Sequence, residues 1–224
     1  MSDFQQEKKL VLEYFNSINN ANNENLIDTI TKYTSSDFKM RCTHPFNELS
    51  GAEEIANNLW VPIKNSFEPI QRRMDIFYAG INSLDDHEGK WVTSMGHLMG
   101  VFDKSFFGIQ PNYKSILLRY AEFYKVENNK ITEGAIFLDI MNFMQQLGLS
   151  VIPESTGLVC ITPGPMNHRG LKYEHSNNVE SQKTLELIHR MRDRLVKGSN
   201  MKSYKDELTL DWHDDMIWWG PGGI

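Results

Sequence analysis

Apolar residues recur at helical spacing in the first part of the chain. Residues 7–20 place one every three or four positions, which predicts an amphipathic helix, and a second short helix is expected over residues 24–33. Residues 37–44 then alternate between polar and apolar side chains, as a strand does, until Pro45 ends the run. The chain is therefore predicted to begin with helix, helix and strand.

Residues 50–66 carry the clearest helix start in the sequence. Ser50 is followed three residues later by Glu53, which is the pattern of a capping box. Apolar side chains continue at helical spacing as far as Ile63. Pro62 predicts a kink or an early end, because proline lacks the N–H group that a helix interior needs.

The spacing of apolar residues then changes from helical to alternating. Four long strands are expected, over residues 74–84, 90–102, 114–127 and 130–141. The gaps between them have the length of hairpin connections, which predicts antiparallel neighbours. Helices followed by such a meander give an α+β fold: a cone-shaped, curved antiparallel sheet wrapped by the N-terminal helices, as in a cystatin-like α+β barrel. A short closing helix is expected over residues 142–149.

The second part of the chain repeats the opening pattern. Residues 151–182 are crowded with proline and glycine, which is typical of an irregular linker or strap. Residues 183–224 then read as helix, weak helix and short aromatic strand, with Pro221 in the place that Pro45 has in the first part. We therefore predict a domain over residues 1–150, a linker, and the helices and first strand of a second copy.

Composition and charge exclude several classes of protein. The hydrophobic share of 40% is enough for a core, and the net charge of −6 argues against a nucleic-acid partner. We find no apolar stretch of membrane-spanning length and no apolar signal segment, so neither a membrane partner nor export is expected. Cys42 and Cys160 are too far apart to resemble a metal pair, which favours free thiols in a cytoplasmic protein. Without a phosphate loop, zinc-type spacing or nucleophile elbow, no cofactor and no metal are expected.

Several motifs follow one another in the strand-rich region. They are His97, Gly108-Ile109-x-Pro111, Lys114, Glu122 through Ile131, Asp139 and Gln146-Leu147-Gly148. In this order they resemble the SnoaL-like polyketide cyclases, which belong to the nuclear-transport-factor-2-like superfamily. The resemblance covers residues 7–150 and, as the start of a second unit, residues 183–224. The chain departs from the family pattern between His97 and Gly108, where it is longer, and at Asn129, where glycine is common.

The resemblance implies a pocket inside the cone for a small, mostly apolar cyclic or polyketide-like molecule. It also implies acid/base chemistry without a cofactor: aldol-type cyclisation, isomerisation or hydration. The alternative is a non-catalytic ligand-binding or dimerisation module, because this scaffold carries many unrelated functions. The outer face of the sheet is the expected surface of a homodimer.

Asp139 and His97 are the candidate catalytic residues. The resemblance implies that an aspartate at the position of Asp139 moves protons, and apolar neighbours on its strand would suit it to that work by desolvation. Asp139 is equally well placed to cap the helix that follows it. His97 would be its helper or an oxyanion donor, or else a hydrogen-bonded residue of the core.

Five residues are candidates for contacting the ligand. They are His44, Trp60, Phe67, Tyr120 and Glu122. His44 ends a strand at the expected pocket rim, whereas the two aromatic residues of the roofing helix would form the pocket wall or plain core. Tyr120 and Glu122 share one face of their strand. If that face points outward, Glu122 is an ordinary solvated charge, which is the favoured interpretation; if it points inward, Glu122 is a second carboxylate in the pocket.

Overall fold

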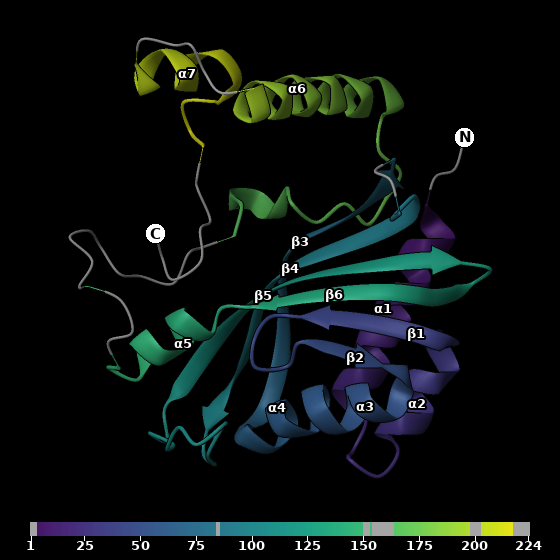
Figure 1. The fold of residues 1–224 in the computed structure, drawn as a ribbon, viewed down its shortest axis with the longest axis vertical. Coiled ribbons are helices and arrows are strands. Elements are labelled where there is room, and N and C mark those ends of the chain that lie inside the picture. Colours follow the sequence, from purple (N-terminus) through teal and green to yellow (C-terminus); the bar gives the residue numbers. More distant parts are fainter. Residues whose placement is uncertain (1–3, 84–85, 150–152, 154–163, 198–202, 217–224) are drawn as a thin grey trace. The chain divides into compact units, whose positions relative to one another are not determined.

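The computed structural model describes residues 4–83, 86–149, 153, 164–197 and 203–216. They form two compact units, of which one ends at Tyr173 and the other begins at Glu174. The first unit opens with α1 (Gln5–Asn20) and α2 (Leu26–Tyr33), as predicted. The apolar stripe of α1, from Leu10 to Ile18, is buried because it packs against the sheet (Figure 1).

The third helical segment is built in three parts. After the short strand β2 (Glu48–Ser50) come α3 (Gly51–Ile55), the π-helical turn η1 (Ala56–Trp60) and α4 (Val61–Ser66). Pro62 lies in the first turn of α4, where its missing N–H leaves no intrahelical bond unmade. The helical segment therefore continues past Pro62. The irregular part of the segment is the wider π turn of η1, which precedes the proline.

The predicted capping box at the start of α3 is wrong by one residue. The Ser50 side chain makes no capping hydrogen bond. Instead, the backbone N–H of Ser50 donates to Glu54 Oε2 at 2.8 Å. The side chain that satisfies the helix start is thus Glu54 and not Glu53.

Six strands form one sheet in the order β2-β1-β6-β5-β4-β3. Their bounds, besides β2, are β1 (Thr34–Cys42), β3 (Phe67–Asn82), β4 (Gly89–Phe102), β5 (Ser115–Glu127) and β6 (Lys130–Leu138). The predicted meander of β3 to β6 is confirmed. The sheet differs from the prediction in two respects: β1 runs parallel to β6, and β2 and β3 stay at opposite edges, so that the described strands curve without closing into a barrel.

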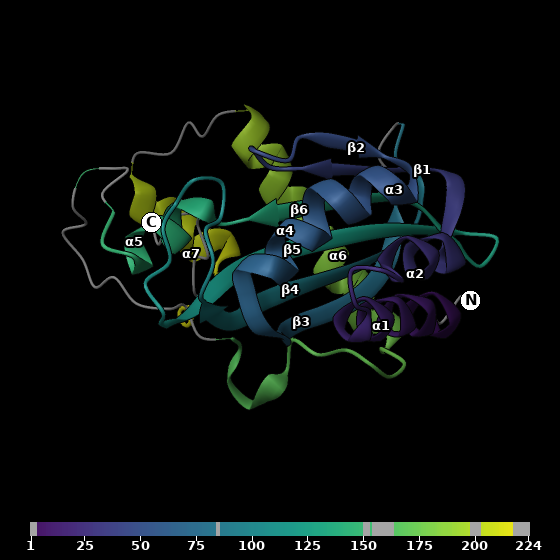
Figure 2. The same cartoon turned by 90° about the horizontal axis from the view of Figure 1, so that it is seen from below.

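The two faces of the sheet have different environments. Helices α1 to α4 lie along one face, which we call the inner face; the opposite one is the outer face (Figures 1 and 2). Along β5, every even-numbered residue from Ile116 to Val126 is buried on the inner face, and the odd-numbered residues between them are only partly buried. This alternation fixes which face each residue of the neighbouring strands occupies, because paired residues share a face.

A strap runs along the free edge of β3. The Phe77 N–H donates to the Gly170 carbonyl at 2.8 Å, and the Lys172 N–H donates to the Phe77 carbonyl at 2.7 Å. The rings of Phe77 and Tyr173 are 5.5 Å apart. Because of these contacts the first compact unit reaches Tyr173, past the predicted domain end at residue 150.

The second unit consists of α6 (Asn178–Lys197) and α7 (Tyr204–Asp211), at the positions of two predicted helices. Arg190 and Arg194 of α6 both bond the Asp211 carboxylate, at 3.1 and 2.5 Å. The end of the predicted aromatic strand, together with Cys160, lies outside the described residues, so the internal duplication stays a prediction. Within the described ranges, no helix is long and apolar enough to cross a membrane.

Candidate functional site

A buried ion pair lies at the middle of the inner face. Arg72 of β3 donates from Nη1 to Glu122 Oε2 of β5 at 2.7 Å, and the two side chains are 2% and 0% exposed. The two strands are separated by β4, which places the small residue Ser94 opposite Glu122. We infer that this small side chain leaves the room in which arginine and glutamate meet.

Aromatic rings surround the Arg72 guanidinium. Its central carbon lies 4.2 Å from the ring centroid of Phe15, 4.7 Å from that of Tyr120 and 5.6 Å from that of Trp60. Such cation–π contacts compensate part of the hydration that a buried cation loses. The Tyr120 hydroxyl is itself paired with Ser94 Oγ at 3.0 Å.

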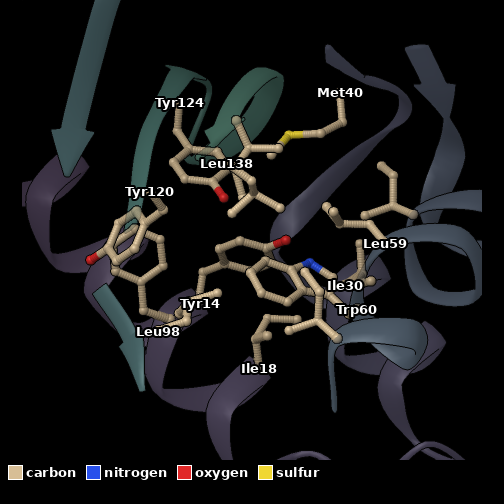
Figure 3. Close-up of a cluster of buried hydrophobic side chains, with 14 of the residues drawn as sticks. Tyr14, Ile18, Ile30, Met40, Leu59, Trp60, Leu98, Tyr120, Tyr124 and Leu138 are labelled. Carbon is tan, nitrogen blue, oxygen red and sulfur yellow. The ribbon is translucent and has the colours of Figure 1, made fainter. Parts of the chain in front are cut away.

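Several polar atoms around the ion pair are buried without a hydrogen bond of good geometry in the described part of the chain. They include Arg72 Nε and Nη2, Glu122 Oε1 and the hydroxyls of Tyr14 and Tyr124, together with Trp60 Nε1. Figure 3 shows the hydroxyls of Tyr14 and Tyr124 and the indole nitrogen of Trp60 directed toward the middle of the cluster. We call these five residues the polar centre. Unsatisfied buried groups cost free energy and are rare, so a cluster of them marks a site.

Burial shifts the proton affinities of this centre in a consistent direction. Desolvation raises the pKa of Glu122, and the charge and hydrogen bond of Arg72 act against that rise. Desolvation and the nearby Glu122 charge also raise the pKa of Tyr14 and that of Tyr124. The two phenols therefore remain protonated hydrogen-bond donors, while Glu122 holds a proton more readily than an exposed glutamate does.

Four predicted ligand-contacting residues lie on the inner side of the fold. Trp60, Phe67, Tyr120 and Glu122 are all buried there. The interpretation of Glu122 as a solvated charge is wrong, because the even-numbered face of β5 is the inner one. His44, by contrast, is exposed in the turn between β1 and β2.

Asp139 lies on the other side of the sheet. Its preceding neighbour Leu138 is buried on the inner face opposite Tyr120, so Asp139 leaves the strand toward the outer face. There its Oδ1 accepts from the Asn142 N–H at 3.0 Å and caps α5 (Ile140–Gln146), while its Oδ2 accepts from Arg119 at 2.9 Å. The structure thus shows the capping alternative.

His97 also belongs to the outer face. It pairs with Arg119 across β4 and β5, and its Nδ1 lies 3.2 Å from Asp75 Oδ2, at a bulge in β3. His97 and Asp139 therefore both neighbour Arg119 but do not meet inside the cone, contrary to the expected acid/base couple. Apolar residues occur on both faces of these strands, so apolar neighbours do not identify the inner face. This is why the sequence pattern predicted inward positions for His97 and Asp139. Catalysis by either residue stays a prediction.

Removing the Asp139 cap is expected to destabilise the fold moderately. Asp139→Ala loses the capping bond and the partner of Arg119, which together should lower the free energy of unfolding by about 1–3 kcal/mol. Asp139→Asn keeps a favourable cap and should lose less. Urea unfolding of the three proteins measures both differences; equal losses in the two variants would contradict a capping role.

His97 is expected to make stability depend on pH. Burial lowers the pKa of His97, Asp75 opposes this, and the charges of Arg119 and Arg73 add to the lowering. A histidine with a lowered pKa binds its proton more weakly in the folded state, so folding is favoured above about pH 6.5 and stability falls below it. The urea midpoint of His97→Gln should decline less than that of the unaltered protein between about pH 7.5 and 5.5; parallel declines would exclude this cause.

Two hollows lie away from the polar centre. One of about 470 Å³ is on the outer face, with Tyr78, Trp91 and Phe123 in its lining. The other, of about 420 Å³, lies between Glu7 of α1 and the turn after β5. Neither is lined by a predicted site residue. Four of the five predicted ligand-contacting residues are buried on the inner face instead.

Arg72, Tyr14 and Tyr124 are the members of the polar centre that were not among the predicted site residues. The predicted strand began at Met74, whereas β3 begins at Phe67, so Arg72 was placed outside the sheet. The available signal was Glu122 between two tyrosines on one strand face: a carboxylate inside a core needs a cation beside it.

Comparison with known proteins gives a family match for part of the chain. Residues 83–147, which include β4, β5, β6 and α5, match the family model of the SnoaL-like polyketide cyclases. This part of the chain is similar to that family. The match supports the predicted SnoaL-like resemblance over these residues. No curated protein is significantly similar to the chain.

Solved structures share the fold of part of this chain. IdmH, a proposed polyketide cyclase from Streptomyces antibioticus, superposes with a TM-score of 0.50 at 13% identity, over 63% of this chain and 97% of IdmH. A proposed polyketide cyclase from Xanthomonas campestris pv. campestris gives a TM-score of 0.50 at 18% identity, over 65% of this chain and 99% of its own. At such identities the similarity shows the fold and leaves the reaction open.

Proposed function

We propose that this chain binds a small, mostly apolar cyclic or polyketide-like molecule on the inner face of its sheet. The observation that carries the proposal is the polar centre: buried donors and one acceptor, without a hydrogen bond of good geometry, converge within a wall of aromatic rings. Ligand sites commonly combine apolar walls with a few placed polar groups and shifted proton affinities. Arg72, Trp60 and the tyrosines would donate to ligand oxygens, and Glu122 would accept from a ligand hydroxyl.

The same groups suit acid/base chemistry without a cofactor. Glu122 Oε1 would take a proton from a carbon next to a carbonyl, and the electron pair of that C–H bond would move onto the carbonyl oxygen as an enolate. Arg72 and the phenols would stabilise the new charge, and Glu122 would return the proton to another carbon. Glu122 thereby takes the role that the sequence assigned to Asp139.

The second candidate is a binding module without catalysis. One observation favours it: the residues predicted as the acid/base couple, Asp139 and His97, lie on the outer face, where Asp139 already caps a helix. In that case Arg72 and Glu122 would recognise a ligand and transfer no proton.

Two flat, oxygen-bearing probes, β-naphthol and β-tetralone, test the binding proposal. Binding is measured by shifts of backbone amide NMR signals. Tyr124→Phe removes one hydroxyl of the polar centre, which neighbours Glu122, with little change of shape and should weaken binding about three- to tenfold. The matched control is Tyr78→Phe in the outer-face hollow, which should leave affinity unchanged. Equal affinities in all three proteins, or no binding of either probe, would count against the proposal.

Deuterium exchange separates the two candidates. The α-hydrogens of β-tetralone exchange in deuterium oxide when a base removes them, and proton NMR follows the loss of signal. An enzyme should accelerate the exchange, and Glu122→Gln should reduce the acceleration by about 10²-fold or more. If the probe binds but its hydrogen exchange is not accelerated, the binding module is the remaining candidate.

A further inference from the structure

The loop of residues 103–114, between β4 and β5, holds two neighbouring aromatic residues in opposite environments. Phe106 is 1% exposed, whereas Phe107 is 54% exposed. Two backbone hydrogen bonds join Phe106 and Ile109, at 3.1 and 3.0 Å, and close a tight turn through Phe107 and Gly108. The loop thus buries the ring of Phe106 and leaves the ring of Phe107 largely exposed to solvent.

Phe106 fills the end of the inner face. Its ring centroid lies 6.3 Å from that of Phe46, 5.3 Å from that of Phe67 and 5.8 Å from that of Phe143. These partners come from the turn after β1, the start of β3 and helix α5. Three separate elements therefore meet around a single side chain that a loop supplies.

An apolar column connects this plug to the polar centre. Phe67 stacks on Phe102 at 5.3 Å, and the buried residues of β4 continue inward from Phe102 to Leu98, which lies opposite Arg72. Under the proposed function, a ligand reaches the polar centre from this end only when the packed side chains of the column, beginning with Phe106, move aside.

The loop is held under backbone strain. Phe107 has φ of 47° and Tyr113 has φ of 58°, a left-handed conformation that costs bulky side chains free energy. Both residues are largely exposed, and we find no packing around Tyr113 that would repay the cost. Strain of this kind concentrates in segments that move for function.

We propose that residues 103–114 are a lid whose plug, Phe106, closes the route to the polar centre. The purpose of the lid rests on the proposed function, but its movement does not. Withdrawal of Phe106 requires that its ring leave the cluster of Phe46, Phe67 and Phe143. It also requires that the loop break or keep as hinges its bonds to Ser66 and Phe102, which are the Ser66 Oγ–H to Ser105 carbonyl bond at 3.1 Å and the Tyr113 N–H to Phe102 carbonyl bond at 3.0 Å.

Cys42 reports on the opening without any ligand. It ends β1 in the same turn as Phe46, its N–H donating to Asn47 at 2.8 Å, and its side chain packs against the core. Burial, with a contribution from the Glu122 charge, raises the pKa of the Cys42 thiol to about 12. The thiol is partly buried and holds its proton tightly, so it reacts slowly in the closed structure.

The test follows labelling of Cys42 by dithiodipyridine in the full chain carrying Cys160→Ser. Phe106→Ala should accelerate the reaction about tenfold or more, and Phe106→Leu should give a smaller increase. Tyr113→Ala, in the exposed part of the same loop, should change the rate less than twofold. Equal rates in the Phe106 variants and the parent would overturn the proposal.

Urea separates lid opening from loss of stability. Opening of one loop exposes little surface, so its labelling rate should depend weakly on urea, whereas global unfolding depends on it steeply. If the labelling rate of Cys42 rises in the Phe106 variants but depends on urea as steeply as global unfolding does, the lid proposal is also overturned. If β-naphthol and β-tetralone do not bind, the proposed function fails, but the labelling of Cys42 still tests the movement of the loop. The two failures are therefore distinguishable.

Discussion

Arg72→Met is expected to lower the free energy of unfolding by about 3–5 kcal/mol, because it leaves Glu122 as an uncompensated charge in the interior. Glu122→Leu should cost a similar amount by stranding Arg72 among the rings of Phe15 and Tyr120. The double variant should be nearly as stable as the unaltered protein, or more so, because apolar residues of similar volume suit this environment. Urea unfolding at neutral pH measures all four proteins.

The pH dependence of the single variant adds a second check. Without Arg72, the rise in the pKa of the buried Glu122 by desolvation is opposed only by the hydrogen bond from Tyr124. A carboxyl with a raised pKa favours the folded state most when it is protonated, so the deficit of Arg72→Met should be smaller at about pH 5 than at about pH 7. A deficit below about 1 kcal/mol, or one that does not depend on pH, would contradict a buried charged pair.

Gly96→Ala is the second substitution for which we expect a large loss of stability. A Cβ atom at Gly96 would lie 2.0 Å from the backbone oxygen of Arg73 on the neighbouring strand. Because a backbone atom of a paired strand cannot rotate away, β3 and β4 would have to separate beside the bulge that presents Asp75. We expect a loss of at least about 3 kcal/mol, at the upper end of overpacking effects.

Gly80→Ala is the matched control on the same pair of strands. A Cβ atom there meets nothing within 4 Å, and the backbone is compatible with alanine. Its stability should stay within about 0.5 kcal/mol of the parent. Thermal or urea unfolding compares the two variants; similar losses at Gly80 and Gly96 would show that general strand preference, and not the close approach, is responsible.

The strands were predictable because their pattern is local. The regular alternation of β5 and the hairpin spacing from β3 to β6 follow from side chains that alternate along a strand. The face that each set occupies is not local. Moving a strand by one residue exchanges its faces, and β4 and β6 carry apolar residues on both. The sequence does not say which face of the sheet points inward. For this reason Asp139 and His97 are predicted to lie in the pocket, and Glu122 in solvent, and all three predictions differ from the structure.

Pairing between distant segments was equally hidden. Nothing in residues 34–42 says that β1 lies parallel to β6, because that choice depends on how the intervening helices and strands return to it. The partner of Glu122 was hidden for the same reason. An arginine two strands away becomes visible as a partner only when the order of the strands is known.

The strap on β3 sets the smallest piece of this chain that can be treated as a module. Sequence similarity to the family ends at residue 147, yet Phe77 completes its backbone pairing only with Gly170 and Lys172. A piece of the chain cut at residue 147 would keep β3 but leave its outer edge around Phe77 bare, and such an edge invites pairing with other chains. A fragment prepared for experiments should therefore extend at least to Tyr173, where the first compact unit ends.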